Sequence, residues 1–276
     1  MAECNNANLG RYVPWHVASF TAGFIRLDRV PIAEQSTAFT SDFGRLEIRG
    51  ANFATRSDAI DRLFEQLVAQ GICRRRHELF AVAPQNETNL SLQIDRGGVA
   101  WFGVRPIGVH LTGYVHTPKG LFVWVGVRAR DKLTYPGRWD NTVAGGQPIG
   151  LSLRDNLTKE CGEEAAIPAA LARLAVPTST IRYLREDESG LKPDTLHCFD
   201  LALPADFTPR PVDGEVEQFL LLPAREVAEV VRDTQRCKPN CNLVWIDFFL
   251  RHHVLDGELS QSEQAELYRQ LTPLLP

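Results

Sequence analysis

The segment from Gly145 to Ile167, GGQPIGLSLRDNLTKECGEEAAI, places a glycine-rich loop directly before a helix with three glutamates in its second half. An α-helix has 3.6 residues per turn, so Glu160, Glu163 and Glu164 lie together on one face. Like charges at this spacing repel one another, but a divalent cation reverses the sign, because Mg²⁺ prefers carboxylate oxygens as ligands. The pattern therefore predicts a metal site on this helix.

The start of the helix is marked by Ser152, a favourable N-cap residue, and by Asp155 three positions later, which makes a variant of the capping box. Leu153, Leu157 and Cys161 form an apolar stripe that should pack inward, with the glutamates beside it. A position beside the buried stripe suits side chains that line a cleft. The alternative is a solvated face, which is the commoner role of glutamate clusters on helices.

This run resembles the Nudix box, the G-x5-E-x7-R-E-U-x-E-E-x-G-U signature of diphosphate hydrolases, in which U is apolar. Gly145 matches the first glycine, Glu160 the glutamate of R-E, and Glu163 and Glu164 the paired glutamates. Three positions depart from the signature, where Glu, Arg and Gly are replaced by Leu151, Lys159 and Ala166. Lysine keeps the charge of arginine but lacks its bidentate fork.

The longer run 134–168 is similar to one Nudix subgroup, labelled thiamine-pyrophosphokinase-like, whose members carry an extra N-terminal domain of unknown function. Residues 211–219 and 238–252 share this resemblance, which covers nearly the whole chain. It implies a diphosphatase that acts on thiamine diphosphate or on its oxidised or otherwise damaged analogues, as a form of metabolite repair. A pyrophosphokinase is not indicated, because the chain has no G-x-x-x-x-G-K-[ST] loop.

The resemblance assigns Glu160, Glu163 and Glu164 to Mg²⁺, with Mn²⁺ as the alternative ion. Either Glu160 or Glu164 would be the catalytic group that takes or positions a proton, since members of the family differ in the identity of the base. Many Nudix enzymes also use a carboxylate from a late loop, and Glu215 is our first choice for this catalytic role. A solvated loop charge is an equally good interpretation of Glu215.

Substrate binding is predicted for five residues in and before the box. Gly145 and Gly146 have no Cβ atom, so chain and metal can approach closely. Lys159 and Arg138 would meet the phosphate charge, and Trp139 would stack on the flat pyrimidine of thiamine. The alternative for Trp139 is a place in the core.

Composition and charge limit the partners and the location that we expect for this chain. The net charge of −4, with no dense basic patch, argues against nucleic acid as a partner, and the partner we expect is a small-molecule diphosphate. No apolar run reaches the roughly 20 residues that span a membrane, and the first residues lack a signal-peptide pattern, so we expect no membrane association and a cytoplasmic location. The sequence leaves open whether the chain forms a homodimer. The six cysteines do not suggest a disulfide scaffold, and Cys237 and Cys241 with His252 and His253 are a weak zinc pattern.

The chain is predicted to hold two domains of α/β class. Residues 1–108 would form a smaller mixed α/β N-terminal domain, with a helix over 58–70 capped by Ser57 and strands near 78–82, 90–94 and 99–104. Residues 109–276 would form a Nudix α/β/α sandwich with C-terminal helices. Its expected strands are 111–116, 121–127, 142–144, 181–185, 196–203 and 218–222. Its expected helices are the box helix, 223–233, 242–255 and 261–271.

Two other functions fit the sequence less well. One is a Nudix hydrolase of a different diphosphate, such as ADP-ribose or a nucleotide sugar. The other is a non-catalytic ligand-binding protein whose box has decayed, which the substitutions at Leu151, Lys159 and Ala166 would permit. The three retained glutamates argue against the second, because a binding protein has little reason to keep charges that repel one another.

Overall fold

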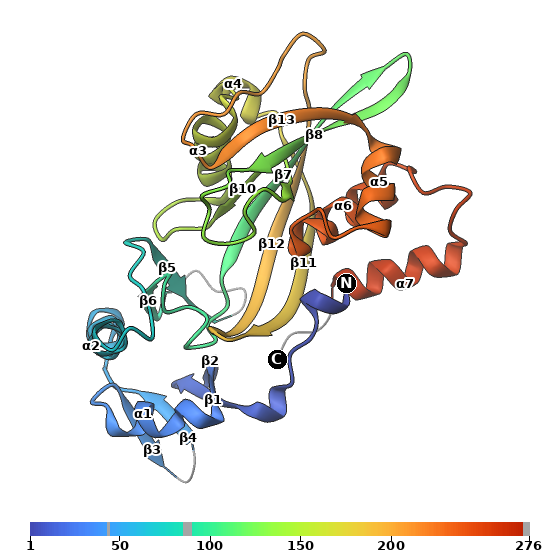
Figure 1. Cartoon of the computed structure of the whole chain (residues 1–276). Coiled ribbons are helices and arrows are strands. Elements are labelled where there is room, and N and C mark those ends of the chain that lie inside the picture. The colour runs from blue at the N-terminus through green and yellow to red at the C-terminus, as the bar shows by residue number, and fades with distance from the viewer. Residues whose placement is uncertain (43–44, 85–89, 273–276) are drawn as a thin grey trace.

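The computed structural model of the chain describes residues 1–42, 45–84 and 90–272, which form an N-terminal unit and a larger sheet unit (Figure 1). The first buried core ends at Val104, and the first strand of the large sheet begins at Ile107. No helix among the described residues is long and apolar enough to cross a membrane.

The N-terminal unit combines a four-stranded sheet, in the order β2-β1-β4-β3, with a two-stranded hairpin, β5-β6. Its strands are β1 (Tyr12–Val17), β2 (Phe20–Arg26), β3 (Phe39–Asp42), β4 (Arg45–Ile48), β5 (Leu79–Val82) and β6 (Leu92–Asp95). Its helices are α1 (Val30–Gln35) and α2 (Phe53–Ala69), with short 3₁₀ turns η2 (Leu9–Arg11) and η3 (Leu27–Arg29), whereas the first 3₁₀ turn, η1 (Ala2–Cys4), packs against the large sheet and its helices, where Cys4 is buried.

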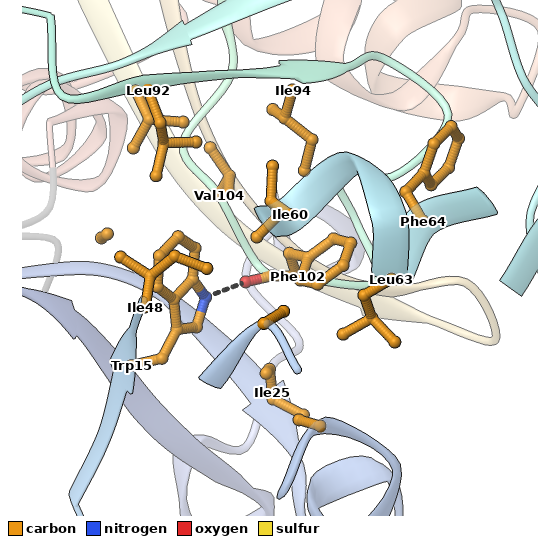
Figure 2. Close-up of a cluster of buried hydrophobic side chains, with 14 of the residues drawn as sticks. Trp15, Ile25, Ile48, Ile60, Leu63, Phe64, Leu92, Ile94, Phe102 and Val104 are labelled. Atoms are coloured by element: carbon orange, nitrogen blue, oxygen red, sulfur yellow. Dashed lines mark hydrogen bonds between the residues drawn. The ribbon is translucent and has the colours of Figure 1, made fainter. Parts of the chain in front are cut away.

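The core of this unit lies between the four-stranded sheet and α2. Figure 2 shows Trp15 and Ile48 from the sheet facing Ile60 and Leu63 from the helix, all of them buried. The Trp15 indole Nε1 donates a hydrogen bond of 2.7 Å to the Phe102 carbonyl, which satisfies the one polar atom of that side chain inside the core.

Two predictions for this unit were wrong. The cap of α2 is Asn52, whose side chain accepts a hydrogen bond from the Thr55 backbone N–H in a complete capping box. Ser57 lies inside the helix, where its hydroxyl donates to the Phe53 carbonyl. The apolar run 99–104 is a series of turns rather than a strand, because it folds over the core around Phe102.

The large sheet has seven strands, with β11-β12-β7-β8-β13 as its main order. Strand β12 is parallel to β7, while β10 pairs with β7 and β9 with β8 in antiparallel register. The strands expected at 181–185 and 196–203 are present and pair with each other, since Ile181 lies opposite Leu196. The strands are β7 (Ile107–Thr117), β8 (Gly120–Arg128), β9 (Trp139–Asp140), β10 (Val143–Gly146), β11 (Val176–Asp187), β12 (Gly190–Ala202) and β13 (Val216–Pro223).

Helices cover both faces of this sheet, as alternation along β7 requires. Val109 and Leu111 join the core under the box helix, whereas Tyr114 joins the core on the opposite face. The α/β/α sandwich is therefore confirmed. The helices are α3 (Leu153–Ala165) and α4 (Ala169–Ala172) on one face, α5 (Ala224–Asp233) and α6 (Pro239–Arg251) on the other, and α7 (Gln261–Leu271) near the C-terminus. Helix α6 starts and ends earlier than predicted, with Pro239 in its first turn.

Candidate active site

The predicted box helix is α3, and both of its ends are defined by local geometry. The Ser152 side chain accepts a hydrogen bond of 3.1 Å from the Asp155 backbone N–H, which confirms the N-cap. The helix ends at Ala166, whose φ of 53° is left-handed. Glycine adopts this conformation without strain. The departure from the Nudix box at Ala166 therefore falls on a helix C-cap and not on a site side chain.

Glu160 lies against the strand β10 at Gly145. A Cβ atom on Gly145 would be 2.3 Å from Glu160 Cδ and 2.7 Å from Glu160 Oε1, which is closer than real Cβ contacts. The Glu160 side chain is only 14% exposed. Glycine at position 145 thus makes room for the Glu160 carboxylate at the edge of the sheet, while the predicted approach of metal and substrate to this glycine stays a prediction.

Glu164 is the most deeply placed of the three box carboxylates, with 7% exposure. Its Oε2 accepts a hydrogen bond of 3.0 Å from the Ala144 backbone N–H on β10. Burial raises the pKa of Glu164 well above its usual value, and the charges of Asp140, Glu160 and Glu215 raise it further, against the effect of the Ala144 bond. A cation beside Glu164 would relieve this repulsion.

Lys159 connects the other two carboxylates. Its ammonium donates to Glu160 Oε1 at 3.1 Å and to Glu163 Oε2 at 2.6 Å, and the Glu163 side chain is 52% exposed. Burial lowers the pKa of Lys159, but these two hydrogen bonds outweigh it and raise the pKa overall. A positive group therefore already sits between two carboxylates of the predicted metal site.

On the late loop, the charge of Glu215 raises the pKa of Glu164, in the same direction as the charges of Asp140 and Glu160. The Glu215 carboxylate is half exposed and forms an ion pair of 2.6 Å with Lys132, while its backbone carbonyl accepts from Ala129. A catalytic role for Glu215 stays a prediction, and its position is compatible with one.

Glu78 at the start of the β5 hairpin is a further carboxylate of the site, and sequence analysis missed it. A Cβ on Gly146 would lie 3.4 Å from Glu78 Oε1, and the charge of Glu78 raises the pKa of Glu160. Arg96 holds the Glu78 carboxylate through an ion pair of 2.7 Å. Nothing in the sequence spacing reveals this approach, since the N-terminal unit contributes Glu78 and the large sheet contributes Gly146.

The remaining substrate-binding candidates, Trp139 and Arg138, contact residues other than the α3 carboxylates. Trp139 is 4% exposed within the core around α6, which is the alternative that its sequence context left open. Arg138 lies 5.2 Å above the Tyr135 ring and directs a guanidinium nitrogen toward the Cys237 carbonyl at 3.5 Å.

The weak zinc pattern is not assembled. His252 Nε2 is hydrogen-bonded to Asp200, and His253 pairs with Asp256. In the described part of the chain, the group of three ligand-type side chains that comes within 4.8 Å consists of His110, Asp140 and Cys241. Two cations already compensate Asp140, since Arg128 lies at 2.8 Å and Lys238 at 3.4 Å from its carboxylate. This buried network is therefore already neutralised by protein charges.

The α3 carboxylates offer the better fit to a hard divalent cation. All of their donor atoms are oxygens, the close approach to β10 depends on Gly145, and an ammonium group already occupies the position between Glu160 and Glu163. The oxygen donors are of the kind that Mg²⁺ or Mn²⁺ prefers, but among the described residues Glu160, Glu163 and Glu164 do not form a group of three ligand atoms within 4.8 Å, so the metal site on α3 stays a prediction.

Comparison with known proteins finds one family model and curated relatives. A family model described as a domain of unknown function, DUF4743, matches residues 1–106. Nudix hydrolase 20, chloroplastic, from Arabidopsis thaliana is 41% identical over 215 residues, which are 78% of this chain and 56% of the relative, so the match spans little more than half of that protein. Nudix hydrolase 24, chloroplastic, from the same plant is 36% identical over 277 residues, covering 98% of this chain and 75% of the relative.

Among solved structures, DR0079 from Deinococcus radiodurans aligns with a TM-score of 0.46 and 18% identity over 60% of this chain and 97% of that one. On the strength of its box carboxylates and of its plant relatives, the chain belongs to the Nudix hydrolase family.

Proposed function

We propose that this chain is a Mg²⁺-dependent hydrolase that cleaves the diphosphate of thiamine diphosphate, or of its oxidised or otherwise damaged analogues, to the monophosphate and phosphate. The observation that carries the hydrolase proposal is the placement of Glu160 and Glu164 against β10. The choice of thiamine compounds rests on the resemblance of 134–168, 211–219 and 238–252 to the thiamine-pyrophosphokinase-like subgroup.

Glu160, Glu163 and Glu164 would hold Mg²⁺, with Mn²⁺ as the alternative. When bound, the cation neutralises the negative charge of a diphosphate and makes water a stronger nucleophile. Glu164 is our choice for the proton acceptor. Its Oε2 is held by the Ala144 N–H, so Oε1 would receive the proton in a state in which Glu160 and Glu163 hold the ion. The charge of Glu215, a second carboxylate, raises the pKa of Glu164 further.

Lys159 would change partners when the cation binds. A divalent ion satisfies Glu160 and Glu163 more strongly than one ammonium does, so the lysine can turn toward the phosphate. In this proposal Lys159 takes over the charge of the box arginine, although without the paired hydrogen bonds of a guanidinium.

The proposal is tested by a turnover screen with Mg²⁺ at about pH 8 that includes thiamine diphosphate, oxothiamine diphosphate, ADP-ribose and a nucleoside diphosphate. We expect phosphate release from the thiamine compounds and a loss of at least a hundredfold in kcat for Glu164→Gln. Glu226→Gln is the matched control, because Glu226 is an exposed glutamate on α5.

A preference for ADP-ribose would keep the hydrolase and discard the thiamine substrate. No turnover of any compound by folded protein would contradict the enzymatic proposal and favour a binding role. Turnover that is unchanged in Glu164→Gln or in EDTA would contradict the assignment of the site.

We also propose a cytoplasmic location, which the sequence predicts, although the names of both plant relatives include the word chloroplastic. Imaging of a fluorescent fusion in the source cell is the test, and accumulation of the fusion in an organelle would overturn this location.

A further inference from the structure

A small pocket of about 260 Å³ lies where the N-terminal unit meets the loop that leads into α3. One wall comes from the β5 hairpin and another from residues 147–151 of that loop. The Ile149 backbone N–H donates to the Leu79 carbonyl at 2.8 Å, and the Gln147 N–H donates to the Ile107 carbonyl at 2.8 Å. Backbone hydrogen bonds therefore hold these walls in place, at the end of the large sheet beside the hairpin (Figure 1).

The lining of this pocket is apolar. Among the described residues that line it none is charged, and the one polar side chain, Gln147, donates from Nε2 to the Leu151 carbonyl at 2.7 Å. Leu151, Leu90 and Ile107 are nevertheless 40%, 41% and 37% exposed. Large apolar side chains that gather around one hollow and stay exposed are typical of a surface that binds an apolar group.

The pocket adjoins the α3 carboxylates. A Cβ on Gly146 would lie 2.7 Å from Phe80 Cζ in the pocket wall, and a Cβ on the neighbouring Gly145 would lie 2.7 Å from Glu160 Oε1. Adjacent Cα atoms are about 3.8 Å apart, so the edge of the Phe80 ring is within roughly 12 Å of Glu160 Oε1. One molecule can therefore reach both places.

The position of Ile107 gives the face of the sheet on which the pocket opens. Ile107 is two residues before Val109 on β7, and Val109 packs in the core under α3. Side chains at i and i+2 of a strand share a face, so the pocket and the α3 carboxylates lie on the same side of the sheet. A volume of about 260 Å³ is below the usual range for whole ligands, so the pocket suits one part of a substrate.

We propose that this pocket binds the organic group attached to the diphosphate, that this group is aromatic or apolar and not a sugar, and that Leu151 and Leu90 select for it. The inference rests on the proposed function, because it takes the diphosphate to lie at α3. Sugar hydroxyls would lose their hydrogen bonds to water here without gaining partners, since the Gln147 amide nitrogen already holds the loop.

The same role gives a reason for the departure from the Nudix box at Leu151. The glutamate of the signature at this position would place a carboxylate in the apolar wall. A carboxylate there would repel the diphosphate that approaches α3 and would lose hydration beside Leu90 and Ile107. Leucine at position 151 is therefore a specificity-determining residue in this proposal.

The test compares two probes with the full chain and Mg²⁺, 2-phenylethyl diphosphate and ribose 5-diphosphate, whose rings are similar in size but differ in polarity. We expect KM to be at least tenfold lower for the phenylethyl compound, which is the order of effect of burying one aromatic ring. Leu151→Gln and Leu90→Gln should each reduce this preference at least threefold with little change in kcat, because the contact is equal in ground state and transition state. Leu174→Gln is the matched control, because Leu174 is 67% exposed outside the pocket.

Calorimetric titration of the same probes, with Ca²⁺ in place of Mg²⁺, gives a readout that does not depend on turnover. Tighter binding of the phenylethyl compound that falls in both leucine variants, without any turnover, would contradict the hydrolase and support the pocket. Turnover of both probes with equal KM and equal affinity would overturn the pocket and keep the hydrolase. A preference that neither leucine variant changes would also overturn the pocket, and absence of both binding and turnover would overturn both proposals.

Discussion

Gly145 and Glu160 are in contact across the β10–α3 junction, where a single added Cβ would come within 2.3 Å of the Glu160 carboxyl carbon. The strand and the box helix therefore approach as closely as they do because position 145 has no side chain. Glu160 is held by this approach at the strand edge, and Glu164 is held one residue away by the Ala144 N–H.

Gly145→Ala should displace the Glu160 carboxylate and reduce kcat at least a hundredfold, since displacements of about 1 Å can cost that much. Gly162→Ala is the matched control, because Gly162 is on α3 like Glu160, and a Cβ on Gly162 meets nothing within 4 Å. It should leave turnover unchanged and stabilise the helix by about 0.5–1 kcal/mol. Equal activity of the Gly145 variant and the parent chain would show that the contact has no role in the reaction.

Ala166→Gly should stabilise the chain. Ala166 adopts φ 53° at the C-cap of α3, where an alanine is strained by about 1 kcal/mol. Part of the gain is offset because glycine makes the unfolded chain more flexible, so we expect a net increase of about 0.5 kcal/mol in the free energy of unfolding. Urea denaturation measures it. Ala170→Gly on α4 should instead destabilise, and a loss of stability in both variants would refute the explanation.

Glu78→Gln tests whether the N-terminal unit takes part in the reaction. Glu78 lies beside Gly146, and its charge raises the pKa of Glu160. The variant should therefore lower kcat/KM about tenfold, which is the usual effect of removing a group that interacts with a metal ligand. Binding of Mn²⁺, followed by its EPR signal, should weaken in parallel. Glu47→Gln on β4 is the control, and identical effects of the two variants would point to a general loss of stability.

Lys159→Gln separates two roles of the lysine. The ammonium bonds Glu160 and Glu163, so its removal should leave Mn²⁺ affinity equal or higher. If Lys159 then contacts phosphate in the loaded enzyme, KM for the diphosphate should rise about tenfold, the magnitude of a lost charge-assisted hydrogen bond. Weaker Mn²⁺ binding in this variant would mean that the lysine supports the metal site instead.

Much of the fold could be predicted because its signals are local. Helix α7 was predicted over 261–271, and there Ser260 and Glu263 form a complete capping box within four residues. The run 99–104 could not be assigned in this way, because its turns follow from the contact of Trp15 with the Phe102 carbonyl, 87 residues away. Local patterns give the start and end of an element, but not which distant group its backbone meets.

The same distinction applies to the site. The carboxylates of α3 could be identified because helical spacing places them on one face. Glu78 could not, because its approach to Gly146 depends on how the N-terminal unit docks against the loop after β10. A backbone hydrogen bond of 2.8 Å from Ile149 N–H to the Leu79 carbonyl fixes that docking. Contacts between two domains produce no periodic pattern in the amino-acid sequence, so the position of Glu78 could not be predicted from it.

His110 predicts how stability depends on pH. Burial, together with the charge of Lys238, lowers the pKa of His110 from 6.5 to about 4, against the opposing effects of Asp140 and Asn141. Above pH 6.5 the imidazole is neutral in both folded and unfolded chains. As the pH falls from 6.5 toward 4, the unfolded chain binds a proton that the folded chain does not, so stability is lost over this window.

The loss due to this one group is on the order of 3 kcal/mol. We expect the free energy of unfolding, measured by urea denaturation between pH 7 and pH 4.5, to fall less steeply for His110→Phe than for the parent chain. Comparing the two slopes cancels the titration of the other groups and any uniform cost of the substitution. Parallel curves would show that His110 is protonated as readily in the folded chain as in the unfolded one, an outcome that the burial of His110 and the positive charge of Lys238 oppose.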